Sequence, residues 1–351
     1  MNIAVMLPNW IGDVVMATPA LRALRSRFGD SARLIAVSRP HASQVLAGLS
    51  WFDDQVIYDR RASADRPGTL GLVRRLRKTN LDSIVLLTNS LRTGIVGWLS
   101  GAKRRIGYKR YGRGPLLTDG LLPPRESGRL TPVSPVDYYL KLVERLGCDA
   151  SDKRVELATT AEDEAAADDV WKRHSISPSD RVIVLNSGGA YGAAKHWPAE
   201  RFAELASRLV RDSRNRVLVI CGPAERSTAE AIEQQAASPR VVSLAREKLS
   251  VGLSKACVRR SSLMITTDSG PRHFAAAFGV PSVALFGPTD PRWSRNYHAG
   301  ERVLQQSLPC VPCSRRTCPL EHHRCMTEMS VEQVYEAAMQ QSNSPNFVNV
   351  A

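Results

Sequence analysis

The sequence predicts an α/β protein with two Rossmann-like domains in tandem, and three observations support this fold class. The chain has 351 residues, 43% of them hydrophobic, which is long for one core and suits two domains of roughly 100–200 residues. From the first residue onward, short apolar runs alternate with longer amphipathic segments, the pattern of βα units on a parallel sheet. A polar stretch at residues 149–180 interrupts this alternation, and a second series then begins.

The first series predicts an N-terminal domain over residues 1–160. Its predicted strands are Ile3–Leu7, Arg33–Val37, Gln55–Tyr58, Ser83–Leu87 and Arg104–Gly107. Its predicted helices lie near Leu21–Phe28, His41–Leu49, Thr69–Lys78 and Leu91–Leu99. A further helix is predicted over Pro135–Leu146, because Gly147 follows it at a position typical of a helix C-cap.

The second series predicts a C-terminal domain over residues 175–330, followed by a helix and tail over 331–351. Its predicted strands are Val182–Asn186, Arg216–Cys221, Arg240–Ser243, Leu263–Thr267 and Ser282–Phe286, and its predicted helices are Ala199–Arg211, Glu225–Ala236, Val251–Val258 and Pro271–Phe278. Part of the polar stretch, Thr160–His174, is also compatible with a helix. Because ligands of open α/β sheets bind outside the carboxyl ends of the strands, we expect the active site in a cleft where the two domains face each other.

The charge of the chain is concentrated in its first half. The formal net charge is +14, and residues 1–150 carry 23 Lys and Arg against 12 Asp and Glu. Such a field can concentrate a polyanion or an anionic membrane face, although a solvated surface is the simpler interpretation. We expect no nucleic-acid partner, because the most basic segment, Arg60–Arg113, has neither an RNP-type aromatic pattern nor a zinc-finger spacing.

The first residues and the hydropathy of the chain indicate where in the cell we expect the protein. The segment Met1–Pro8 lacks the basic flank, apolar core and cleavage site of a secretory signal. No apolar run approaches the roughly 18–20 residues that span a bilayer. We therefore expect a cytoplasmic protein.

Asp13 is the candidate catalytic residue. The first predicted strand runs into Pro8, Asn9, Trp10, Ile11 and Gly12, and an apolar helical face begins at Val14. A carboxylate at this strand-to-helix turn can accept the proton of an attacking hydroxyl, while Gly12 lets the backbone approach a ligand. The alternatives are that Asp13 caps the helix, or that the helix begins later, with Thr18 and Pro19 as N-cap and first residue.

Three strand ends of the C-terminal domain carry the candidate donor-binding residues. The small-residue loop with Ser187, Gly188 and Lys195 offers backbone N–H groups and a positive charge to phosphate oxygens, without the order of a Walker loop. A suitable anion site lies where a second strand leads into an apolar helix, at Asp268, Ser269, Gly270 and His273. The alternative is that Asp268 caps this helix and that His273 is a half-buried structural residue. Glu225 follows a third strand end and can accept hydrogen bonds from ribose hydroxyls, or simply favour the first turn of a helix.

Metal binding is a weaker prediction. Cys310, Cys313, Cys318 and Cys325 form a C-x2-C-x4-C-x6-C cluster in which four thiolates could hold zinc, but the spacing matches no standard zinc module. The sequence has no Asp-x-Asp after an apolar strand to hold a divalent ion on a diphosphate. Leaving-group charge would then be met by Lys195 and helix N-termini.

Four motifs, taken in order, resemble the ADP-heptose:lipopolysaccharide heptosyltransferases over nearly the whole chain. They are Trp10-Ile11-Gly12-Asp13-Val14-Val15-Met16-Ala17-Thr18-Pro19-Ala20-Leu21, Lys195-His196-Trp197-Pro198, Thr267-Asp268-Ser269-Gly270-Pro271-Arg272-His273 and Arg316-Thr317-Cys318-Pro319-Leu320-Glu321-His322-His323-Arg324-Cys325. The last motif is typical of the heptosyltransferase II branch. The resemblance implies a GT-B fold, with an acceptor-binding N-terminal domain and a nucleotide-sugar-binding C-terminal domain, and an inverting, metal-independent transfer without a cofactor.

The resemblance also implies roles for individual residues. Asp13 would be the general base, Lys195 the diphosphate ligand and Glu225 the ribose contact. The donor would further contact Ser187, Gly188, Asp268, Ser269, Gly270 and His273, and the acceptor Asn9, Trp10, Arg60, Arg61 and Arg92. The donor would be ADP-heptose, and the acceptor the inner-core heptose of lipopolysaccharide, an anionic lipid-linked sugar at the cytoplasmic face of the inner membrane. Ala190 and Tyr191 stand where the family often has polar residues, which weakens side-chain contacts from that loop.

Three alternatives remain open. The enzyme could use another nucleotide sugar, or it could be a nucleotide-sugar epimerase, which shares the fold and needs no acceptor. A non-catalytic module that binds anions through its basic first domain would release no ADP from any sugar donor.

Overall fold

The structure is a computed structural model that describes residues 1–59, 68–189 and 191–342. The chain forms two compact domains. The N-terminal domain comprises Met1–Ala158 together with Arg292–Asn296, and the C-terminal domain comprises Thr159–Pro291 and the chain from Tyr297 onward. The segment Arg292–Asn296 is tied to its domain by Ser134, whose hydroxyl donates to the Arg295 carbonyl at 2.6 Å.

The N-terminal domain is built on a six-stranded parallel sheet with the order β3-β2-β1-β4-β5-β6. The strands are β1 (Asn2–Met6), β2 (Arg33–Ser38), β3 (Asp54–Ile57), β4 (Ser83–Leu86), β5 (Arg104–Tyr108) and β6 (Asp119–Leu121). The helices are α1 (Ile11–Phe28), α2 (Pro40–Leu46), α3 (Thr69–Lys78), α4 (Leu91–Leu99) and α5 (Pro135–Val143). The five predicted strands and five predicted helices are confirmed; β6 and the short hairpin β7 (Arg125–Glu126) and β8 (Arg129–Leu130) were not predicted.

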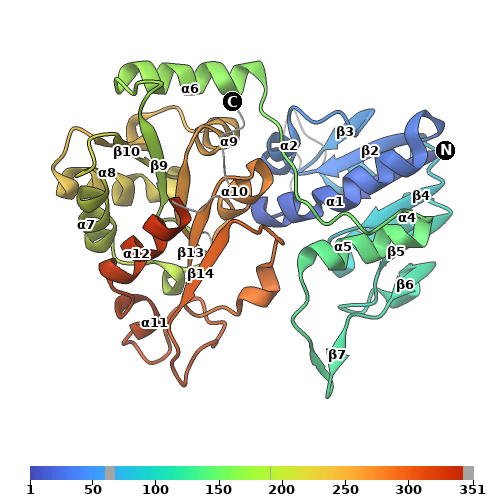
Figure 1. Ribbon diagram of the computed structural model, residues 1–351. Coiled ribbons are helices and arrows are strands. Elements are labelled where there is room, and N and C mark those ends of the chain that lie inside the picture. The colour runs from blue at the N-terminus through green and yellow to red at the C-terminus, as the bar shows by residue number, and fades with distance from the viewer. Residues whose placement is uncertain (60–67, 190, 343–351) are drawn as a thin grey trace. The chain divides into compact units, whose positions relative to one another are not determined.

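The helices of this domain divide between the two faces of the sheet. Helix α1 packs against α2 and α5, which runs beside it (Figure 1), whereas α3 packs against α4. Right-handed crossovers produce this division. From β1 the chain adds β2 and β3 on one side of that strand, and it then adds β4, β5 and β6 on the other side, so the connecting helices change face. Leu72 and Leu76 of α3 and Val96 of α4 share one buried cluster with Ala4 and Met6, which point to the same face of β1.

Helix α1 begins at Ile11 and contains Pro19 in its interior, so the interpretation with Thr18 as N-cap is wrong. A proline has no N–H, and the carbonyl of Val15, four residues earlier, therefore lacks its helical donor. The Thr18 hydroxyl donates to this carbonyl at 2.7 Å and accepts from the Glu156 N–H at 3.0 Å. The helix continues through Pro19 because a buried side chain satisfies the freed carbonyl.

The C-terminal domain repeats the same architecture, with the sheet order β11-β10-β9-β12-β13-β14. Its strands are β9 (Arg181–Asn186), β10 (Asn215–Ile220), β11 (Val241–Ser243), β12 (Leu263–Thr267), β13 (Ser282–Phe286) and β14 (Glu301–Gln305). Its helices are α6 (Ala161–Arg173), α7 (Ala199–Leu209), α8 (Arg226–Ala236), α9 (Val251–Arg259), α10 (Arg272–Phe278), α11 (Arg324–Thr327) and α12 (Val331–Ser342). Helix α12, red in Figure 1, packs against α7.

The predicted strands of this domain are confirmed, and so is the helix in the polar stretch. Thr160 and Asp163 form a capping box that starts α6, in which each side chain accepts from the other residue's N–H at 3.1 and 3.0 Å. Strand β14 was not predicted. In the ranges that the structure describes, no helix is both long and apolar enough to cross a membrane.

Candidate functional site

Asp13 is the third residue of α1, in the first turn after β1. Trp10 is the N-cap of this helix and makes no side-chain capping bond. Across the described chain, the half-buried Asp13 carboxylate has neither a hydrogen bond nor an ion pair, so it does not cap the helix. Loss of hydration raises the pKa of this carboxyl from 3.8 to about 6. A carboxylate with this pKa is a stronger base than an ordinary aspartate, yet it is mostly ionised at neutral pH.

The predicted acceptor-binding residues have different environments. Trp10 is exposed, and the Asn9 carbonyl accepts from His41 Nε2 at 2.5 Å, which ties the turn after β1 to helix α2. Arg92, in the first turn of α4, donates from Nη2 to the Thr69 hydroxyl at 2.7 Å. Arg60 and Arg61 lie outside the described residues.

Arg113 is a buried residue that the sequence did not single out. It is fully enclosed, and its guanidinium donates from Nε to the Tyr108 carbonyl at 2.8 Å, to the Thr88 carbonyl, and from Nη2 to Asn89 Oδ1 at 3.2 Å. Burial lowers its pKa to about 10. Arg113 thus braces the carboxyl ends of β4 and β5 and orients Asn89, whose Oδ1 also accepts from the Tyr138 hydroxyl at 3.2 Å.

In the C-terminal domain, the candidate donor residues lie at the topological switch point. The strand order reverses between β9 and β12, and ligands of such sheets bind at this point, outside the carboxyl ends of the strands. Asn186, at the end of β9, donates from Nδ2 to the Ser269 hydroxyl at 2.6 Å. The Thr267 hydroxyl, at the end of β12, donates to the Gly188 carbonyl at 2.6 Å. These two hydrogen bonds join the loop after β9, which contains Ser187 and Gly188, to the loop after β12, which contains Asp268.

Glu225 reaches the same place from the end of β10. Its carboxylate accepts from the Gly222 N–H at 2.9 Å. A Cβ added at Gly188 would lie 2.9 Å from Glu225 Cδ, so the two residues are in direct contact. Ser187 is buried beside Gly188, and its hydroxyl has no hydrogen-bond partner in the described part of the chain. Gly188 thus leaves the space that the Glu225 side chain occupies.

Lys195 and Asp268 form a buried ion pair, which the sequence did not predict. The Lys195 ammonium group contacts Asp268 Oδ2 and donates to the Asp268 carbonyl at 3.1 Å, and it lies 4.5 Å from the centre of the Tyr191 ring. Thr289 donates to the same carboxylate at 2.8 Å. Burial alone would raise the pKa of Asp268, but the charges of Lys195 and Arg272 outweigh burial and hold the pKa below its ordinary value.

Two further charges complete this cluster. Arg272, at the start of α10, pairs through Nε with Glu301 at 2.7 Å. The four charged groups, those of Lys195, Arg272, Asp268 and Glu301, balance one another. His273 is buried, and burial, with a smaller effect of the Arg272 charge, lowers its pKa to about 3. Its imidazole is therefore neutral at physiological pH and adds no charge to this site.

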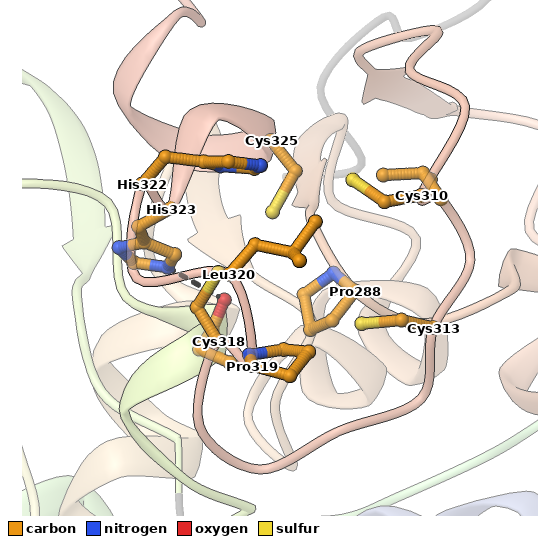
Figure 2. A pocket seen from close by; sticks show the side chains of 11 residues that line it. Pro288, Cys310, Cys313, Cys318, Pro319, Leu320, His322, His323 and Cys325 are labelled. Atoms are coloured by element: carbon orange, nitrogen blue, oxygen red, sulfur yellow. Dashed lines mark hydrogen bonds between the residues drawn. The ribbon is translucent and has the colours of Figure 1, made fainter.

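The cysteine segment covers the Lys195 loop. The Ala194 N–H donates to the Arg316 carbonyl at 3.0 Å, the Tyr191 hydroxyl donates to the Ser314 carbonyl at 2.7 Å, and His323 Nε2 lies 2.8 Å from the Ala194 carbonyl. Figure 2 shows Cys310, Cys313, Cys318 and Cys325 around a small pocket, with the side chains of Leu320 and Pro288 between them. No group of three or more possible metal ligands was found in the ranges that the structure describes. The contacts that hold the segment on the loop are the hydrogen bonds of Arg316, Ser314 and His323.

Comparisons with known proteins show what the chain and its fold are similar to. Residues 69–324 match glycosyltransferase family 9 (heptosyltransferase). Lipooligosaccharide heptosyltransferase 2 of Campylobacter jejuni is 26% identical over 96% of this chain and 97% of its own length, and lipopolysaccharide heptosyltransferase 2 of Escherichia coli is 25% identical over 96% and 97%. The solved structure of a family 9 glycosyl transferase from Veillonella parvula matches with a TM-score of 0.81 and 26% identity over 97% of both chains. That of E. coli ADP-heptose lps heptosyltransferase II matches with a TM-score of 0.77 at 22% identity, over 97% of this chain and 98% of that one.

Proposed function

The chain belongs to glycosyltransferase family 9 (heptosyltransferase), and from this membership we propose that it transfers heptose from ADP-heptose to the inner-core heptose of lipopolysaccharide. The names of the similar proteins from C. jejuni and E. coli support this choice of sugar and acceptor. The GT-B fold supports it as well, because both domains have the parallel sheets expected of that class. The mechanism that we propose is inverting and needs no metal.

The C-terminal domain binds the donor in this proposal. Glu225, which reaches the switch point from β10, accepts hydrogen bonds from the ribose hydroxyls. Lys195 stabilises the diphosphate, and Asp268 contributes mainly by holding the Lys195 ammonium group in place. The remaining donor contacts are Ser187, Gly188, Ser269, Gly270 and the neutral imidazole of His273.

The chemical step uses Asp13 as the general base. An acceptor hydroxyl oxygen attacks C1 of the heptose and forms the new glycosidic bond. The bond between C1 and the diphosphate oxygen breaks, and ADP leaves with its electron pair. The hydroxyl proton passes to the Asp13 carboxylate. Attack opposite the leaving group inverts the configuration at C1.

One observation carries the catalytic assignment: the Asp13 carboxylate has no partner in the described chain, and its pKa is raised to about 6. A structural aspartate is normally paired or hydrogen-bonded. A general base needs the opposite, a carboxylate that is free to take a proton and basic enough to keep it.

The acceptor and its location complete the proposal. Asn9, Trp10 and Arg92 contact the acceptor, together with Arg60 and Arg61, and the excess positive charge of residues 1–150 suits its phosphates and carboxylates. The enzyme works at the cytoplasmic face of the inner membrane, peripherally, and binds no nucleic acid.

Nucleotide release tests the proposal. ADP-, GDP- and UDP-sugars are offered with and without a deacylated core acceptor, and we expect release of ADP from ADP-heptose only when the acceptor is present. The product is then examined for inversion at C1, and turnover is compared with and without a chelator. Conversion of the donor alone would favour an epimerase, and release from another donor would reject the assignment of ADP-heptose.

A further inference from the structure

Helices α3 and α4 pack against each other and share an exposed surface on the N-terminal domain. Arg92, in the first turn of α4, links their starting turns by its hydrogen bonds to Thr69. On α3 this surface presents basic side chains, and on α4 it presents large apolar ones. We define the α3–α4 surface as the following exposed residues of the two helices: Leu70, Arg74, Arg75, Arg77, Lys78, Leu91, Ile95 and Trp98.

Helix α4 is apolar on its solvent side as well as on its buried side. Leu91, Ile95 and Trp98 recur at a spacing that places them on one face, and they are 45%, 39% and 55% exposed. On the other side, Gly94 and Gly97 allow a close approach: a Cβ at Gly94 would lie 2.9 Å from Arg113, and one at Gly97 would lie 3.3 Å from Leu86. Large apolar side chains that gather at the surface commonly mark an interaction site. The outer face of α4 is therefore suited to bind a partner.

The cations of α3 are exposed and not neutralised. Arg74, Arg75, Arg77 and Lys78 all lie at the surface, and none of them pairs with an acidic group within the described ranges. Other cations of the same domain do have carboxylate partners, as Arg25 does with Asp53 and Arg104 with Asp119. Leu70, 71% exposed, lies one turn before Arg74 on the same helix. An apolar stripe thus lies beside a row of free positive charges.

We infer that the α3–α4 surface docks this protein on the anionic headgroup layer of a lipid bilayer. Apolar side chains that enter the boundary between headgroups and acyl chains, flanked by cations that meet lipid phosphates, are what interfacial binding requires. Trp98 is well suited to this position, because tryptophan is enriched at membrane interfaces. The inference deepens the proposed function, on which the choice of a lipid surface as the partner rests, and it assigns a face of the protein to the membrane.

Vesicle binding tests the inference without any sugar transfer. The full chain is sedimented with vesicles of phosphatidylcholine, with and without phosphatidylglycerol. The charge variant is Arg74→Gln, Arg75→Gln and Arg77→Gln combined. Its control removes three exposed cations of the C-terminal domain, Lys172→Gln, Arg211→Gln and Lys248→Gln, and so has the same net charge. Trp98→Ser is the apolar variant, and Leu122→Ser, at another exposed leucine, is its control.

We expect the wild type to bind the vesicles that contain phosphatidylglycerol and to bind more weakly at high salt. The charge variant should bind on the order of 100-fold more weakly, from about five-fold for each cation. Trp98→Ser should bind roughly ten-fold more weakly, while both controls bind within about two-fold of the wild type. All variants replace exposed side chains and should keep the wild-type melting temperature and turnover on a deacylated acceptor.

Several results would overturn the inference. One is a wild type that does not prefer anionic vesicles, and another is a charge variant that binds as its control does. Tight binding to a soluble polyanion such as heparin, without binding to vesicles, would point to another partner and would equally reject it. Should the triple variant fail to fold, Trp98→Ser alone decides. If the wild type bound anionic vesicles but showed no turnover with ADP-heptose and acceptor, the proposed function would be rejected and the docking surface would stand.

Discussion

Replacing Asp13 by asparagine should stabilise the protein at neutral pH while it abolishes turnover. The folded chain raises the pKa of this carboxyl from 3.8 to about 6. Because each pKa unit corresponds to about 1.4 kcal/mol, the ionised carboxylate costs the fold up to about 3 kcal/mol. Asp13 is half-buried and not fully enclosed, so we expect a measured gain of about 1–3 kcal/mol from removing the charge.

The sign of this effect gives it a characteristic pH dependence. Below pH 3.8 the carboxyl is protonated in both the folded and the unfolded chain, so its titration costs the fold nothing. As the pH rises through the window from 3.8 to about 6, the unfolded chain releases its proton first, and wild-type stability falls relative to Asp13→Asn. Above that window the difference is complete and constant.

Thermal unfolding at several pH values measures the difference between variant and wild type. For a domain of this size, each kcal/mol shifts the melting temperature by roughly 2–4 °C, so Asp13→Asn should melt several degrees above the wild type at pH 7.5 and at the same temperature near pH 4. Asp30→Asn, at an exposed carboxylate in the turn after α1, is the matched control and should show no such trend.

Activity completes this test. Asp13→Asn should bind ADP-heptose as the wild type does but lose turnover, since an amide cannot accept the proton. The wild-type kcat should also fall as the pH drops through about 6. A variant that is less stable than the wild type at pH 7.5, or one that retains near-normal turnover, would refute the reasoning from the raised pKa.

Three further substitutions test the site and the fold. Lys195→Met should raise the KM for ADP-heptose by about 10- to 100-fold and lower stability by up to about 3–5 kcal/mol, since Asp268 stays buried; adding Asp268→Asn should restore stability, measured by urea unfolding, but not activity. Gly188→Ala should displace Glu225 and raise the same KM about ten-fold, whereas Gly114→Ala, whose added Cβ would stay 3.6 Å from Lys109, should not change it. Thr18→Val should cost about 1–3 kcal/mol in urea unfolding, because the Val15 carbonyl and the Glu156 N–H lose a partner; Thr18→Ser should recover most of it, and equal losses for both variants would contradict this account.

The interior strands of each sheet and one edge strand of each, β3 and β11, could be predicted from the sequence, while the opposite edge strands could not. Strands such as β1 and β12 are buried on both faces, so they appear as continuous apolar runs. The edge strands β6 (Asp119–Leu121) and β14 (Glu301–Gln305) are less buried and contain charged or small residues, which give no such run. The start of α1 was also ambiguous, because Pro19 normally marks the beginning of a helix and the compensating Thr18 hydroxyl depends on the folded neighbourhood.

The candidate site was predicted in its positions but not in its electrostatics. Strand ends indicated where Asp13, Lys195, Glu225 and Asp268 would lie. Neither the raised pKa of Asp13 nor the ion pair between Lys195 and Asp268 has a local signal, since both depend on what surrounds them in three dimensions. Arg113 was one of many arginines in a basic stretch, and only its complete burial distinguishes it.

The two domains hold their cations in different ways, and this decides how each can meet an anion. In the C-terminal domain, Lys195 and Arg272 are buried against Asp268 and Glu301, so a diphosphate would enter a cluster whose charges already cancel. Its binding must then come from short, directed hydrogen bonds, which salt screens little. In the N-terminal domain, the cations of α3 are exposed and unpaired within the described chain, so their attraction extends through water over about a Debye length. The exposed cations of α3 therefore contribute to the net charge of +14 and suit the anionic partner proposed for this surface, whereas the paired charges of the pocket proposed for the nucleotide contribute nothing to it.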